Sequence, residues 1–133
     1  MVRASPAANT VEQVLARARP EDMRLVLVEA LRVQALVAVR RGQRDSATRS
    51  VEEGLELARH MPYPYAEARL LHVYGRLHVQ KREPQAAQER LEAARALFRR
   101  LGADKDAEWV EQAKRRAMPP AKPKRRAKPA ARA

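Results

Sequence analysis

The fold is decided by residues 31–59, LRVQALVAVRRGQRDSATRSVEEGLELAR, which recur in approximate form 40 positions later as residues 71–99, LHVYGRLHVQKREPQAAQERLEAARALFR. The residues that keep their identity between the two copies are Leu31, Val33, Val39, Ala47, Glu52, Leu57 and Arg59. A period in this range is typical of stacked helical hairpins. Because one hairpin has too little core to stand alone, neighbours cover one another and the stack presents an extended surface to other polypeptides. The repeat therefore predicts a binding module rather than a catalyst.

Helical spacing of apolar residues, together with the positions of Pro and Gly, predicts where each element begins and ends. Pro64 and Pro84 suit the first turn of a helix, and Gly102 suits the left-handed position after a helix end. We expect an all-α chain, a right-handed α-solenoid of antiparallel helical hairpins. The predicted order is a disordered segment 1–9, a short helix 10–19, hairpins 21–61 and 64–102, a capping helix 104–117 and a disordered basic tail 118–133, with residues 10–117 forming the folded domain.

Small residues recur at matching places in the two copies. The first copy carries Leu31, Gln34, Ala35, Ala38, Ala47, Val51 and Gly54, and the second carries Leu71, Tyr74, Gly75, His78, Ala87, Leu91 and Ala94. With these residues, 31–101 resembles two tetratricopeptide (TPR) repeats, whose signature places small side chains where two helices cross closely. We expect such crossings at Ala35 with Ala47 and at Gly75 with Ala87, since close approach requires small side chains. The period exceeds the usual value of about 34 residues.

A second resemblance concerns residues 66–71, AEARLL, and residues 94–103, ARALFRRLGA. These runs are similar to the helical repeats at the carboxyl end of bacterial ATPase-linked transcriptional regulators, where such repeats sense an inducer or a partner protein. The resemblance implies a detached sensor or regulatory segment. The four glycines are scattered and form no phosphate-cradling loop, so no ATPase motif accompanies the repeats.

The first helix of the second hairpin carries the candidate partner-binding residues. In TPR-like stacks this type of helix lines a concave groove, and Tyr and Arg are frequent anchors at protein interfaces. The predicted groove residues are Tyr63, Tyr65, Arg69, His72 and Gln80. Tyr74 belongs either to the groove or to the core. Trp109 is expected to cover Leu97 and Leu101 at the open end of the stack; the alternative is that it is a binding hot spot for a partner or a second copy.

The positive charge is concentrated near the carboxyl end. Of the 28 Lys and Arg, nine lie from Lys114 onward, with no acidic residue among them. An unfolded polycation of this kind binds nucleic acid nonspecifically through phosphate contacts. The alternative function is therefore a nucleic-acid-binding accessory protein, and its candidate residues are Lys122, Lys124, Arg125, Arg126 and Lys128.

Other classes of function find little support. No Cys is present, and His60, His72 and His78 have no ligand spacing, so neither a metal site nor a cofactor is predicted. No nucleophile stands beside a recognisable base, so we expect no enzymatic activity. No apolar run is long enough for a membrane span, and the predicted location is cytoplasmic. Because about three repeats are usually needed for stability, homodimerisation through an exposed end is also expected.

Overall fold

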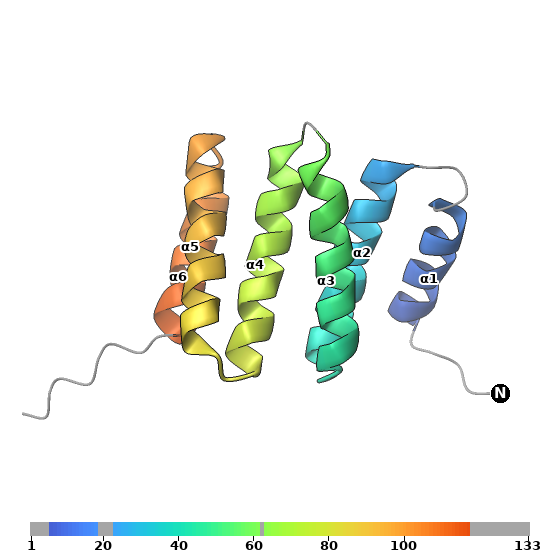
Figure 1. Ribbon diagram of the computed structural model, residues 1–133, viewed down its shortest axis with the longest axis horizontal. Helices are drawn as coiled ribbons and strands as arrows, with labels where there is room; N and C mark the ends of the chain where they lie inside the picture. The colour runs from blue at the N-terminus through green and yellow to red at the C-terminus, as the bar shows by residue number, and fades with distance from the viewer. Residues whose placement is uncertain (1–5, 19–22, 62, 118–133) are drawn as a thin grey trace, which may run out of the picture.

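The computed structural model describes residues 6–18, 23–61 and 63–117, and within these ranges it contains helices and no strand. Figure 1 shows the helices side by side, with α1 at one end of the molecule and α5 and α6 at the other. Their bounds are α1 Pro6–Ala18, α2 Arg24–Arg40, α3 Arg44–Arg59, α4 Pro64–Gln80, α5 Pro84–Arg100 and α6 Asp104–Ala117. The expected all-α class is confirmed. None of these helices combines the length and apolar character needed to cross a membrane.

The 40-residue period divides into two equal steps. Helices α2 to α6 begin at residues 24, 44, 64, 84 and 104, so a new helix starts every 20 residues. Three of the turns share one geometry, with positive φ at Gly42 (+73°), Arg82 (+61°) and Gly102 (+76°). In each turn the amide that follows donates to a carbonyl five residues earlier, as in Gln43 to Ala38 at 2.8 Å. This pattern satisfies carbonyls at the helix end.

The helices form two layers. Helices α2, α4 and α6 contact one another in succession, and we call them the inner layer. Helix α3 contacts α2 and α4, α5 contacts α4 and α6, and α1 contacts α2, so these three helices form the outer layer. Residues on facing sides of α2, α4 and α6 are therefore neighbours although they lie 40 positions apart in the chain.

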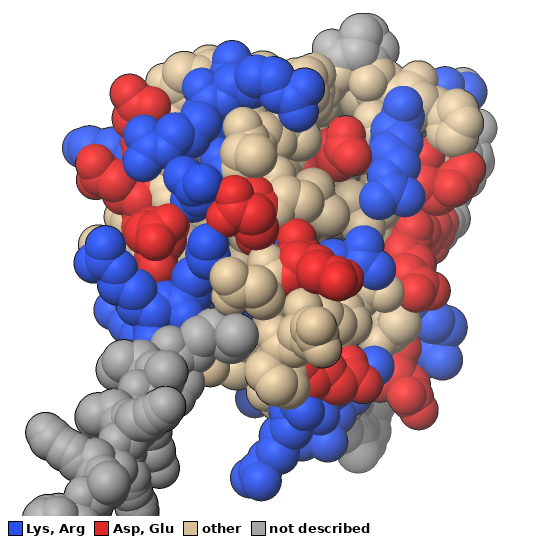
Figure 2. Space-filling view, turned by 60° about the vertical axis from the view of Figure 1, so that its left-hand side comes forward, with Lys and Arg blue, Asp and Glu red and all other residues tan. Residues whose placement is uncertain are grey.

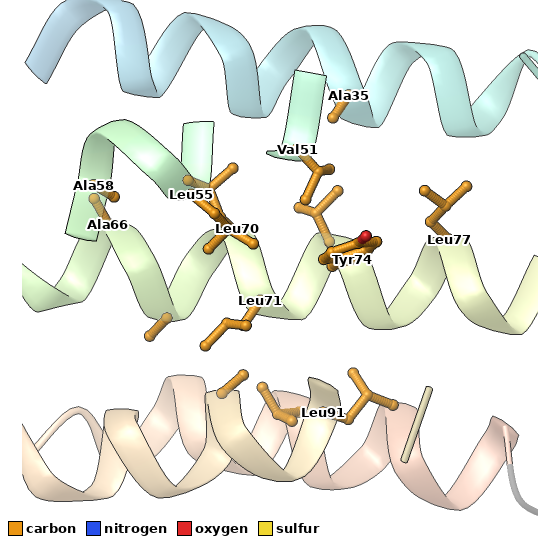
Figure 3. Packing of buried hydrophobic residues seen from close by; sticks show 14 of the residues in the cluster. Ala35, Val51, Leu55, Ala58, Ala66, Leu70, Leu71, Tyr74, Leu77 and Leu91 are labelled. Atoms are coloured by element: carbon orange, nitrogen blue, oxygen red, sulfur yellow. The ribbon is translucent and has the colours of Figure 1, made fainter. Parts of the chain in front are cut away.

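The buried side chains form two clusters, a large one with residues from α2 to α6 and a smaller one between α1 and α2. Figure 3 shows Leu70 and Tyr74 on the side of α4 that faces α2 and α3, and Leu71 on the side that faces α5. Tyr74 is buried, and its hydroxyl donates to Glu52 Oε2 at 2.9 Å, so Tyr74 belongs to the core. A guanidinium group, that of Arg90, lies 4.3 Å from the centre of the same ring.

The predicted small positions are buried where helices meet. Ala35, Ala47 and Ala87 are each 0% exposed. A Cβ atom placed on Gly75 would lie 2.6 Å from Leu91 Cγ, so Leu91, rather than the expected Ala87, provides the closest contact there. At Gly54 a Cβ would lie 3.1 Å from both terminal methyl groups of Leu70. Both glycines therefore occupy close helix crossings.

Helix α1 begins earlier than expected. It starts at Pro6 rather than Thr10, so residues 6–9 are helical, and their predicted disorder is wrong. Pro is well suited to the first helical turn and Ala is the strongest helix former, which explains the extension through Ala7 and Ala8. Residues 1–5 and the predicted disordered tail 118–133 lie outside the described residues.

Ion pairs fasten α6 to α5. Glu92 accepts from Lys114 Nζ at 2.7 Å and from Arg95 Nη2 at 2.9 Å. Arg95 Nε also lies 3.5 Å from Glu111. Hydrogen bonds from Arg95 and then Lys114 lower the pKa of Glu92 from its ordinary 4.5 to about 2. Glu92 is therefore ionised at neutral pH and holds the last helix against the stack.

Candidate partner-binding groove

The inner layer encloses a groove along α4. Its larger part, about 590 Å³, lies between the carboxyl halves of α2, α4 and α6. Its smaller part, about 310 Å³, lies nearer the amino end of α4. The two parts share His72, Arg76 and Trp109, so they are continuous. The groove is thus built mainly by three helices that the 40-residue period brings together, and Leu91 and Phe98 of α5 also line it.

The larger part of the groove is cationic and apolar. Arg76 and Arg116 line it together with Trp109, Val39 and Val79, and no lining residue is acidic. Within residues 6–18, 23–61 and 63–117 neither of these arginines forms an ion pair. Trp109 is 61% exposed. This surface can accept a carboxylate and an apolar side chain next to each other.

The smaller part is largely occupied by its own contacts. Tyr65 donates from its hydroxyl to Asp106 Oδ2 at 3.0 Å, which joins α4 to α6. Arg69 donates from Nη1 to Glu29 Oε1 at 3.2 Å, which joins α4 to α2, and Arg32 donates to the same oxygen at 3.3 Å. Burial and the hydrogen bond to Asp106 raise the pKa of Tyr65. Tyr65 and Arg69 therefore line the groove but already bridge the inner helices.

His72 lies where the two parts of the groove meet. Burial, followed by the nearby charge of Arg76, lowers the pKa of His72 from 6.5 to about 4. The imidazole is consequently neutral at pH 7. The positive potential of the groove comes from its arginines.

Gln80, the last residue of α4, links α4 to α2 at one end of the groove. Its Nε2 donates to the carbonyl of Val39 at 2.7 Å, across from α4 to α2. Its Oε1 is buried and has no hydrogen-bond partner among the described residues. Gln80 thus fixes the spacing of the two helices at this point.

The structure places four of the five predicted groove residues, Tyr65, Arg69, His72 and Gln80, along the groove. Tyr63 is not a lining residue; it precedes α4, is 38% exposed, and lies with its ring 6.2 Å from that of Tyr65.

The expectation for Trp109 is wrong. Rather than covering Leu97 and Leu101, Trp109 is mostly exposed and faces the groove. Leu101 is itself 42% exposed. The reason is the turn at Gly102, which brings α6 back beside α4 and so directs Trp109 to the inner layer.

Two groove residues, Arg76 and Arg116, were missed in the sequence. A signal for them existed in the repeat itself, since Leu36, Arg76 and Arg116 occupy one position in α2, α4 and α6. Extending the 40-residue spacing to α6 would have aligned them.

The remaining candidates lie elsewhere. His60 is exposed and directly follows α3. His78 is buried, stacks on Tyr74 with ring centres 4.6 Å apart and shares a 2.7 Å hydrogen bond with Glu83. In the part of the chain that the structure describes, no three or more metal-binding side chains come together. The proposed nucleic-acid contacts, Lys122, Lys124, Arg125, Arg126 and Lys128, fall outside the described residues.

Comparison with known proteins gives no relative: no protein-family model, curated protein or solved structure matches the chain. The chemistry of the groove is therefore the basis for assigning a function.

Proposed function

We propose that this chain is a TPR-like protein-interaction module, a right-handed solenoid of antiparallel hairpins whose groove binds an acidic segment of a protein partner. The observation that carries the proposal is the pairing of Arg76 and Arg116, both without an ionic partner among the described residues, beside the exposed ring of Trp109. Exposed Arg and Trp together are the side chains that most often anchor protein interfaces.

The recognition mechanism follows from the shape and charge of the groove. A partner carboxylate next to Arg76 or Arg116 gains a charge-assisted hydrogen bond. An apolar partner side chain covers Trp109, Val39 and Val79 and removes them from water. The bridges from Tyr65 to Asp106 and from Arg69 to Glu29 keep the walls in place, so little ordering is required on binding.

The resemblance to the repeats of bacterial regulators extends this proposal to a regulatory role. In that role the groove holds a segment of another protein, and the chain acts as a detached sensor or adaptor. An acidic, partly apolar segment is the partner chemistry that the groove favours.

A peptide titration tests the proposal. The probe is a short peptide of Glu and Leu, compared with a counterpart in which Lys replaces each Glu. Trp109 is the only Trp in the chain, so its fluorescence reports directly on the groove. We expect the Glu peptide to bind and Arg76→Glu to weaken binding about tenfold, the effect of roughly 1.4 kcal/mol.

Arg49→Glu is the matched control. Arg49 is exposed on α3, in the outer layer, and its reversal changes the net charge by the same amount. Equal binding of the two peptides, or equal effects of Arg76→Glu and Arg49→Glu, would show that the groove does not select acidic segments.

The alternative, nonspecific nucleic-acid binding through the basic tail, rests on the nine Lys and Arg from Lys114 onward. Salt dependence separates it from groove binding. With about five phosphate contacts, the logarithm of the DNA affinity falls with the logarithm of the salt concentration at a slope of roughly −4. DNA retention that is independent of salt would exclude this second function.

A further inference from the structure

The opposite end of the molecule carries an apolar hollow that the groove does not include. It measures about 350 Å³ and lies between α1 and α2, where Val11 and Val14 face Leu25, Val26 and Val33. Leu25 is 45% exposed and Val26 is 38% exposed, although both are large apolar residues. Exposed apolar side chains gathered in one place mark an interaction site more often than scattered ones do.

The repeat explains which neighbour this end lacks. Val26, Glu29 and Val33 on α2 correspond, 40 positions on, to Ala66, Arg69 and Val73 on α4. On α4, Arg69 bonds to Glu29 of the preceding inner helix, and Val73, 3% exposed, lines the same hollow as Arg32 and Leu36 of that helix. Ala66 is 1% exposed and lies beside Ala58 of α3 (Figure 3). Helix α2 has the same face but no inner helix before it among the described residues. Its apolar positions are therefore left partly in water.

The α6 end differs in chemistry. The positions through which α4 faces α6 are His72 and Arg76, and their counterparts on α6 are Gln112 and Arg116. Figure 2, which brings the α5 and α6 end forward, shows Lys and Arg interspersed with Asp and Glu over this region. Stacking this end onto Val26 and Val33 would bury polar and charged groups without partners, which is costly. A head-to-tail chain of copies is therefore disfavoured.

We propose that the α1–α2 face is a self-association surface, through which two copies pair around a twofold axis. Such an interface uses the same patch on both copies, so apolar meets apolar. Charge supports a second copy in this orientation. The chain carries a net charge of +12, most of it from Lys114 onward, and α6 lies at the far end of the row from α1. Pairing through the α1–α2 end, where the hollow is lined mainly by apolar side chains, keeps the strongly basic ends of α6 apart.

The interface is small. A stable complex usually involves roughly 20–30 residues on each partner, whereas eight residues line this hollow. We therefore expect a weak dimer, with a dissociation constant on the order of 10 μM.

Sedimentation velocity on the full chain at several concentrations tests the proposal. Val26→Glu places a charge on both sides of the twofold interface and is expected to raise the dissociation constant at least about 100-fold. Val79→Glu is the matched control, because Val79 is the same residue with the same exposure of 38% but lies on α4. The dissociation constant of the Val79→Glu dimer should equal that of the unmodified dimer. Leu25→Glu repeats the test at a second position, and circular dichroism confirms that each variant is folded.

Three results would overturn the proposal. The unmodified chain could remain monomeric up to about 1 mM, a hundred times the expected dissociation constant. The dissociation constants of the Val26→Glu and Leu25→Glu dimers could equal that of the Val79→Glu dimer. Leu101→Glu, at the α5–α6 turn, could dissociate it instead, which would place the contact at the other end.

Discussion

The two helical glycines, Gly54 and Gly75, differ in the space that is available for a larger side chain. At Gly75 the neighbour is Leu91, with Cγ 2.6 Å and the backbone nitrogen 3.5 Å from a built Cβ. At Gly54 only the terminal methyl groups of Leu70 come close, at 3.1 Å, and these can move by side-chain rotation. The helix crossing at Gly75 therefore tolerates an added side chain less well than the crossing at Gly54 does.

We expect Gly75→Ala to lower the free energy of unfolding by about 1–2 kcal/mol. Overpacking costs about 1–3 kcal/mol, and the better helix propensity of Ala returns up to about 1 kcal/mol. Gly54→Ala serves as the comparison and should stay within about 0.5 kcal/mol of the unmodified protein. Urea unfolding measures both. Unchanged stability of Gly75→Ala would contradict the close crossing of α4 and α5.

His72 makes stability depend on pH. Its pKa is about 4 in the folded chain and near 6.5 when unfolded, so between these values the unfolded chain binds the proton first. Its contribution is complete above pH 6.5 and is lost as the pH falls towards 4, by up to about 3 kcal/mol. His72→Gln should flatten this part of the stability curve, measured by urea unfolding at each pH. Parallel curves for the unmodified protein and His72→Gln would refute the assignment.

At this scale the sequence was informative about small residues and less so about charged ones. Alanines such as Ala35 and Ala47 were predictable, because only small side chains fit close crossings. Tyr65 and Arg69 line the groove, but their bonds to Asp106 and Glu29 span about 40 residues and have no local signal. Arg76 was overlooked because an exposed arginine on a helix resembles any solvated charge.

Helix ends were predictable to within a few residues where Pro or Gly marks them. Pro64 and Pro84 begin α4 and α5 as expected, and Gly102 has the left-handed conformation predicted for it. Helix α1 was less predictable, because its start at Pro6 precedes the plausible cap at Thr10. The strict 20-residue step was also missed, since one turn uses Arg82 where the others use Gly42 and Gly102.

Arg82 offers a prediction for the turn between α4 and α5. Its φ of +61° costs a non-glycine residue roughly 1–2 kcal/mol, whereas glycine adopts it freely. Because glycine loses more freedom on folding, we expect Arg82→Gly to raise the free energy of unfolding by about 1 kcal/mol and the melting temperature by a few degrees. Gly102→Arg should produce a loss of similar size. Thermal denaturation of both variants is the measurement, and a lower melting temperature for Arg82→Gly would be inconsistent with the turn geometry.

At the scale of the whole molecule, the repeat determines which helices become neighbours. An offset of 40 residues predicts that α2, α4 and α6 share a face, and the contacts among them agree. What the sequence did not predict is that the two ends of the row differ, with Val26 exposed at one and Arg116 at the other. That difference depends on which apolar faces lack a neighbour, and this follows only from the assembled layers.

The constant 20-residue step makes the chain extensible. If residues 44–83 were duplicated in tandem, Glu83 would precede Arg44 just as Gln43 does, and each added helix would start one step after the last. The lengthened protein would gain one more hairpin and a longer groove, and every new turn would be of a kind that the chain already contains. Growth by copying whole units is thus open to this architecture, whereas the insertion of a single residue within α4 would rotate the rest of that helix by about 100° and separate its buried side from its neighbours.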